Sequence, residues 1–265
     1  MHDRDIPSVA PPVDALLRPR PWGVWPTIGF TLIVIMVTFV VGMVIGAVMG
    51  VVAGTQLEPE EVGEFIEGLD SNGLLISLYV LIASPVIIGW TLLFVVLRKG
   101  PTIAEYLAIR KVGWRPLMKW LLAVIALGMM SDLISFIIGR PIIPNYSIEM
   151  YETAYVVPFL WFALVLVSPI SDETLYRGFL FAGLVESRLG AIGAVIIGAV
   201  VWSGLQIQYG PYTIATLFAL AVLIGFARYK TQSLLPCIAM SALWNLYSMI
   251  TLTIYMELYS TAGAV

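Results

Sequence analysis

Hydrophobic residues fall along this chain in seven long blocks, separated by shorter polar segments. A helix of about 20 apolar residues crosses the hydrocarbon core of a bilayer and satisfies its own backbone hydrogen bonds there. The pattern therefore predicts an all-α polytopic transmembrane helical bundle of about seven spans. The fourth span is expected to continue as a polar helix to about Arg188. The expected spans are Thr27–Gly54, Leu74–Leu97, Met118–Gly139, Val156–Ser171, Ala191–Gln208, Pro211–Ala227 and Leu234–Met256.

Composition supports the membrane assignment and excludes other classes. Of the 265 residues, 60% are hydrophobic and 12% are charged, whereas a soluble domain is roughly half apolar and a quarter charged. The net charge of −3 provides no basic surface, so we expect membrane lipid and no nucleic acid as a partner. The chain holds one histidine, His2, and one cysteine, Cys237, which excludes a metal site that needs two such ligands. No cofactor-binding motif is present, and no cofactor is expected.

The basic residues predict an orientation, because cytoplasmic loops are enriched in Lys and Arg. Twelve of the fourteen lie on one side of the predicted bundle: three in the N-terminal tail, six in 98–119, then Arg188, Arg228 and Lys230. The segment Gln56–Asp70, on the other side, has six acidic residues and no basic one. We therefore expect a cytoplasmic N-terminus and an external C-terminus in a prokaryotic cytoplasmic membrane. The expected parts are a cytoplasmic tail 1–26, N-terminal spans 27–153, a core bundle 154–257 and an external tail 258–265.

Ionisable side chains at membrane depth are costly and are therefore candidates for function. Glu173 and Arg177 have the spacing of an intrahelical ion pair, which is either purely structural or part of a site. Asp172 points about 100° around the helix from Glu173 and is the carboxylate left for chemistry. Asp132 is either a cavity-lining group or, as we favour, a protonated acid bonded to a neighbouring helix.

Three short motifs in the second half of the chain share an order with those of a known protein family. They are Asp172-Glu173-x-x-x-Arg177, Trp202-x-x-x-Gln206 and Ser241-x-x-x-Asn245. They resemble the Glu-Glu-x-x-x-Arg, Phe-x-x-x-His and His-x-x-x-Asn motifs of the CAAX-protease and bacteriocin-processing family. These intramembrane endopeptidases are related to the type II CAAX prenyl endopeptidase. The resemblance implies a helical bundle in which these three motifs face one chamber.

The resemblance also implies that this chain differs from the family at the positions that would take part directly in hydrolysis. Asp172 stands where the family has the water-activating Glu, and Gln206 and Ser241 stand where it has His. A misplacement of about 1 Å can cost roughly a hundredfold in rate, and loss of an oxyanion donor costs about 10²- to 10³-fold. The residues that are kept, Glu173, Arg177 and Asn245, can serve structure alone.

Two functions follow, from different classes. We favour a pseudoenzyme, a binder or scaffold for another membrane protein or a lipid-like chain, in which Arg177, Trp202 and Ser241 are structural. The alternative is an active endopeptidase of glutamic or aspartic type that cleaves a membrane-associated peptide substrate. Its catalytic residues would be Asp172, Glu173, Gln206 and Asn245, without a metal. In both, the polar chamber is expected between the fourth, fifth and seventh spans and open toward the basic, cytoplasmic side.

Overall fold

The computed structural model describes residues 20–262, and the tail residues before them, His2 included, lie outside the described part. The described part of the chain consists of helices and their connections and contains no strand, which confirms the all-α bundle. The first half contains α2 (Val24–Gln56), α3 (Pro59–Glu67), α4 (Gly73–Leu97), α5 (Ile103–Tyr106), α6 (Trp114–Ile137) and α7 (Asn145–Glu152). The second half contains α8 (Val157–Trp161), η1 (Phe162–Val167), α9 (Ser168–Glu173), η2 (Thr174–Leu180), α10 (Phe181–Val185), α11 (Gly190–Gly204), α12 (Pro211–Thr231) and α13 (Leu235–Ala262).

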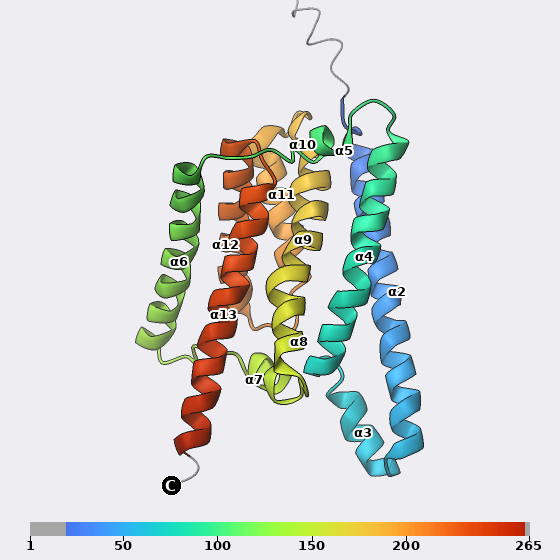
Figure 1. Ribbon diagram of the computed structural model, residues 1–265, viewed down its shortest axis with the longest axis vertical. Helices are drawn as coiled ribbons and strands as arrows, with labels where there is room; N and C mark the ends of the chain where they lie inside the picture. The colour runs from blue at the N-terminus through green and yellow to red at the C-terminus, as the bar shows by residue number, and fades with distance from the viewer. Residues whose placement is uncertain (1–19, 263–265) are drawn as a thin grey trace, which may run out of the picture.

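Six helical segments in the described chain are long and apolar enough to cross a membrane. One of them, Val157–Val185, combines α8, η1, α9, η2 and α10 into a single rod, called here the motif helix. The expected fifth span is shorter than predicted, because α11 has 15 residues and extends only about 22 Å. Figure 1 shows these segments side by side, running alternately up and down.

Apolar side chains cover the outside of the bundle as well as its interior. Phe39, Phe136 and Ile192 are each at least 67% exposed, although they lie on three different long helices. A helix that is hydrophobic all round belongs in a large core or in lipid. Because these side chains have no protein neighbour to cover them, the chain is an integral membrane protein.

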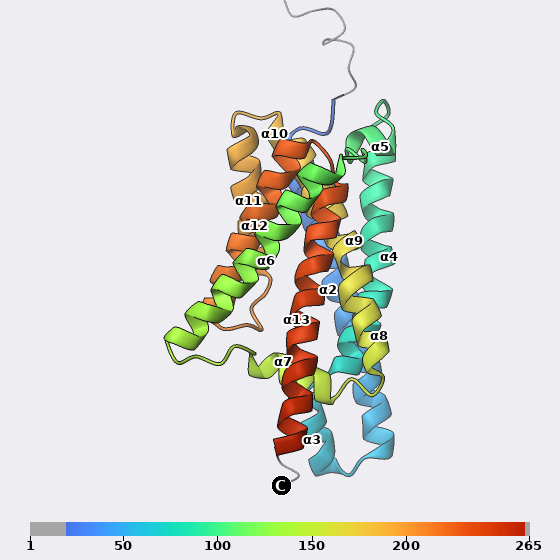
Figure 2. The same ribbon diagram turned by 60° about the vertical axis from the view of Figure 1, so that its left-hand side comes forward.

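Basic and acidic residues gather at opposite ends of the bundle, the end with α5 and the end with α3 and α7 in Figures 1 and 2. The basic end, where α5 lies, has connections that hold Arg98, Lys99, Arg110, Lys111 and Arg188. The acidic end, where α3 and α7 lie, holds Glu58, Glu60, Glu61, Glu64, Glu67, Asp70, Glu149 and Glu152. Arg228 and Lys230, expected in a loop, are instead in the last turn of α12. The assignment of the basic end to the cytoplasm stays a prediction.

The core is densest around the C-terminal half of the motif helix, near the basic end. The Phe179 ring stacks on Tyr106 of α5 with ring centroids 5.6 Å apart, and Leu184 is completely buried. Gly183 allows α2 to approach, since a Cβ there would lie 2.0 Å from Thr27 Oγ1. This packing fixes the motif helix at one end and leaves its first half to line a cavity.

Candidate functional site

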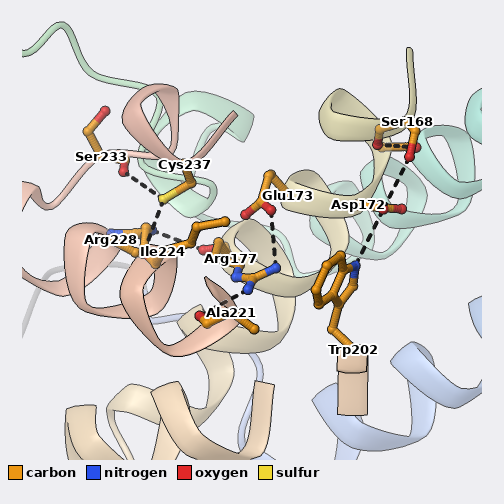
Figure 3. A network of polar contacts seen from close by, with 11 residues as sticks. Ser168, Asp172, Glu173, Arg177, Trp202, Ala221, Ile224, Arg228, Ser233 and Cys237 are labelled. Atoms are coloured by element: carbon orange, nitrogen blue, oxygen red, sulfur yellow. Dashed lines mark hydrogen bonds and ion pairs between the residues drawn. The ribbon is translucent and has the colours of Figure 1, made fainter. Parts of the chain in front are cut away.

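Asp172 lies on α9 and is held by two side chains (Figure 3). Its Oδ2 accepts hydrogen bonds from the Trp202 indole Nε1 at 3.4 Å and from the Ser168 hydroxyl at 3.3 Å. Trp202 comes from α11, so this contact joins the first and second motifs. As expected from the helical spacing, Asp172 does not share the partner of its neighbour Glu173.

Glu173 and Arg177 form the predicted ion pair in the protein interior. Arg177 Nη1 donates to Glu173 Oε1 at 3.1 Å, and the two side chains are 4% and 0% exposed. Arg177 also donates from Nη2 to the Ala221 carbonyl of α12 at 3.0 Å, and its guanidinium lies 5.5 Å from the centre of the Trp202 ring. The pair therefore ties the motif helix to two neighbouring helices.

The second carboxylate oxygen of Glu173 lacks a hydrogen bond to any described residue. Within the described residues, Glu173 Oε2 has no hydrogen-bond partner, although the Ser241 side chain of α13 lies near enough to act on the carboxylate. Ser241 is 6% exposed and stands where the motif that it resembles has His. Ser241 therefore packs against the ion pair at the edge of the bundle's interior, and its short side chain does not extend as far as a histidine would.

Arg228, expected among the basic residues at the cytoplasmic side, is a buried cation. It is 4% exposed, its Nε donates to the Arg177 carbonyl at 2.9 Å, and its guanidinium lies 5.0 Å from the centre of the Phe181 ring. Nothing in the local sequence separates Arg228 from the neighbouring Lys230, because both follow the same apolar block. Only packing against the motif helix distinguishes them.

The second motif is only half helical. Trp202 lies in α11, but this helix ends at Gly204, so Gln206 lies in the connection to α12 and not in a helix as expected. The Gln206 Oε1 accepts a hydrogen bond from Gln208 Nε2 at 2.7 Å. The Gln206 side chain is therefore bonded within the connection between α11 and α12, and it forms no hydrogen bond with Asp172 among the described residues.

The third motif contributes a structural contact. Asn245 of α13 donates from Nδ2 to the Leu164 carbonyl of η1 at 2.7 Å. In the π-helical geometry of η1, that carbonyl would receive the N–H of the residue five positions later, which is Pro169. Proline has no N–H, so Asn245 supplies the donor that the backbone lacks.

One large cavity joins the three motifs. Its volume is about 1040 Å³, and it is bounded by side chains of α2, α4, α6, α9, α12 and α13. The motif residues on its wall are Asp172, Trp202, Gln206, Ser241 and Asn245. The buried pair Glu173 and Arg177 does not line it.

The direction of the cavity differs from the expectation. Its wall includes Asp70, Pro141 and Tyr209, which belong to connections at the acidic end, so the prediction that it opens toward the basic end is wrong. The reason is packing: the basic end is filled by the aromatic and leucine core around Phe179. The motif residues lie in the other half of the bundle.

Asp132 of α6 both contacts a neighbouring helix and lines the cavity, while the expectation that it is protonated stays a prediction. The Tyr247 hydroxyl of α13 donates to Asp132 Oδ2, and Asp132 also lies on the cavity wall. Gly128 brings the two helices together, because a Cβ there would lie 2.9 Å from the Tyr247 ring. Nearby, Ser131 Oγ and Thr216 Oγ1 lie 3.2 Å apart and join α6 to α12.

The described part of the chain has no cluster of side chains that could hold a metal ion. No group of three His, Cys, Asp or Glu side chains lies together there. The cavity wall offers hydroxyl, amide, indole and carboxylate groups, which can donate to or accept from an occupant and can take up a proton at Asp172.

Comparison with known proteins gives one match. Residues 154–247 match the model of a family described as type II CAAX prenyl endopeptidase Rce1-like. No curated protein and no solved structure matches the chain. The matched range runs from just before α8 into α13 and so contains all three motifs.

Proposed function

We propose, from the premise that residues 154–247 belong to the CAAX-protease and bacteriocin-processing family, that this membrane protein is a catalytically degenerate member. Its cavity binds a segment of another membrane protein, or a lipid-like chain, without cleaving it. The family's motif chamber is kept as a binding site, while the groups that carry out hydrolysis are replaced or engaged elsewhere.

The observation that carries this proposal is the set of hydrogen bonds around Asp172. Hydrolysis needs a base for water together with donors placed where negative charge develops on the substrate oxygen. Of the two motif amides that could donate, Asn245 already donates to the Leu164 carbonyl. Gln206 accepts from Gln208 through its Oε1 and lies in the connection after α11, without a hydrogen bond to Asp172 in the described part of the chain. The donors on Asp172 itself are Trp202 and Ser168, which hold the carboxylate in place.

An active endopeptidase is the second candidate, and one observation favours it. Asp172 lies on the wall of a cavity large enough for a peptide, where a carboxylate can accept a proton from water. An amide also has two N–H donors, so Asn245 can bond Leu164 with one and still offer the other.

Cleavage assays in lipid nanodiscs separate the two functions. The substrates are membrane proteins that copurify with this chain. The variants are wild type, Asp172→Asn, and a triple variant that restores the family residues through Asp172→Glu, Gln206→His and Ser241→His. We expect wild type and Asp172→Asn to leave the copurified proteins intact and to retain the same amount of them.

The opposite result would be clear. Cleavage by wild type that falls by about 10² or more in Asp172→Asn identifies Asp172 as a working base and refutes the binder. Cleavage by the triple variant alone would support the binder, because it would show that the cavity admits a peptide and lacks only the catalytic groups.

A further inference from the structure

The cavity wall carries carboxyl groups and, among the described residues, no basic side chain. Three carboxylates line it from three separate elements: Asp70 in the connection between α3 and α4, Asp132 on α6 and Asp172 on α9. No Lys, Arg or His is among the described residues that line it. An occupant of this cavity therefore meets carboxyl groups on a wall that no described Lys or Arg side chain lines, although Arg177 lies behind Trp202 near Asp172.

Asp132 is the most available of the three within the bundle. It accepts a hydrogen bond from the neutral Tyr247 hydroxyl, and no described Lys or Arg lies within ion-pairing distance of it. Arg140, at the same end of the bundle, places its guanidinium 5.4 Å from the centre of the Tyr212 ring and does not line the cavity. A carboxylate has about four acceptor positions, so Asp132 can receive further donors.

Aromatic rings complete a surface that suits a cation. Trp202, Tyr212, Trp244 and Tyr247 all line the cavity, and since Arg177 lies over Trp202 and Arg140 over Tyr212, the rings open to an incoming cation are Trp244 and Tyr247. Indole and phenol faces attract ammonium and guanidinium groups, most strongly where water is excluded. A bound cation also favours the charged form of a nearby carboxylate, so the two kinds of group reinforce each other.

The remaining polar groups favour a peptide over a lipid chain. Ser131, Thr216, Ser241 and Asn245 lie around the same wall and offer hydroxyl and amide groups. A peptide backbone presents a donor and an acceptor at nearly every residue, whereas an acyl chain presents neither. Such a lining matches a peptide segment along its length as well as at one charged group.

We propose that the cavity selects a peptide segment of a membrane-associated protein that carries a Lys or Arg side chain, and that Asp132 receives this cation. Asp70 at the mouth attracts the same charge during entry. The inference rests on the proposed function, that the cavity holds a chain, and adds the charge by which the chain is chosen.

The test measures binding with the full-length protein in nanodiscs of zwitterionic lipid. The probes are fluorescent peptides of one apolar sequence with a central Lys, norleucine or Glu, read by anisotropy, and empty nanodiscs give the background. We expect wild type to bind the Lys peptide at least about tenfold more tightly than the norleucine peptide, and the Glu peptide least, as charge-assisted hydrogen bonds imply.

Variants locate the effect. Asp132→Asn should bring the Lys peptide to within about twofold of the norleucine peptide while leaving norleucine binding unchanged. Glu186→Gln makes the same charge change at an exposed position at the other end of the bundle and should change neither. If Asp132→Asn does not fold, the wild-type peptide series alone still decides whether the cavity prefers a cation.

Several results would overturn the inference. Equal binding of the three peptides, or equal weakening of all peptides by Asp132→Asn, would refute charge selection at Asp132. Displacement of the Lys peptide by dodecylammonium, but not by excess unlabelled Lys peptide, would identify a lipid amine as the occupant and refute the peptide. Because the assay reads binding, charge selection can fail while the binder proposal stands, and cleavage can refute the binder while charge selection stands.

Discussion

The Asn245 side-chain amide donates to the Leu164 carbonyl, the acceptor that Pro169 leaves without a backbone partner. This contact joins α13 to the first half of the motif helix at the wall of the cavity. It gives Asn245 a structural reason to be present whether or not the protein hydrolyses a substrate. A kept motif residue is therefore not by itself a sign of activity in this chain.

Replacing Asn245 should destabilise the protein independently of any substrate. Asn245→Leu keeps the branched shape of the side chain and removes the donor, so the Leu164 carbonyl loses this partner. We expect the free energy of unfolding to fall by about 1–3 kcal/mol. Thermal unfolding in detergent measures this, with Ser248→Ala on the same helix as the control. Unchanged stability of Asn245→Leu would show that the contact is unimportant.

Removing the cation of the Glu173–Arg177 pair should cause a larger loss of stability. Arg177→Ala leaves Glu173 charged or forces it to take up a proton in a completely buried position, and also removes the bond to the Ala221 carbonyl. Breaking a buried pair costs about 3–5 kcal/mol. We expect low accumulation in membranes and a much lower unfolding temperature, while Lys119→Ala at an exposed position has little effect.

A double replacement tests whether the loss comes from the stranded charge. Glu173→Leu combined with Arg177→Met removes both charges and keeps most of the volume. Since a buried pair can be exchanged for apolar residues at little cost, this variant should be more stable than Arg177→Ala alone. A double variant less stable than the single one would point instead to Arg177's contacts with α11 and α12.

Gly183 and Gly198 allow a matched test of the close packing between α2 and α10. At Gly183 an added Cβ would lie 2.0 Å from Thr27 Oγ1, whereas at Gly198 nothing lies within 4 Å. Gly183→Ala should lower the free energy of unfolding by about 1–3 kcal/mol through overpacking of α2 against α10. Gly198→Ala should be neutral or stabilise by up to about 1 kcal/mol, because alanine favours the helix. Comparable unfolding temperatures for the two variants would contradict the close approach.

The orientation can be read by cysteine labelling, because the natural Cys237 is completely buried. Gln208→Cys at the cavity end should react with a membrane-impermeant maleimide in intact cells. Lys111→Cys at the basic end should react only after the membrane is opened, as the distribution of Lys and Arg predicts. The reverse pattern would place the cavity mouth in the cytoplasm.

The sequence alone determined the class of fold, the ion pair between Glu173 and Arg177, and the shared position of the motifs. Hydropathy depends only on local composition, so the helical bundle and most span positions could be predicted. The spacing of Glu173 and Arg177 predicted their ion pair, since neighbours on one helix face need no tertiary information. The three motifs predicted a shared chamber, and the cavity wall does bring Asp172, Trp202 and Asn245 together.

Only the tertiary structure decided what these residues contact and where the cavity opens. The Phe179 core fills the basic end and leaves space at the acidic end, a result of packing between helices distant in sequence. The early end of α11 at Gly204 moves Gln206 into a connection, and contact with the motif helix buries Arg228 while Lys230 stays exposed. These outcomes depend on which surfaces of different helices face one another, and no local pattern in the sequence encodes that choice.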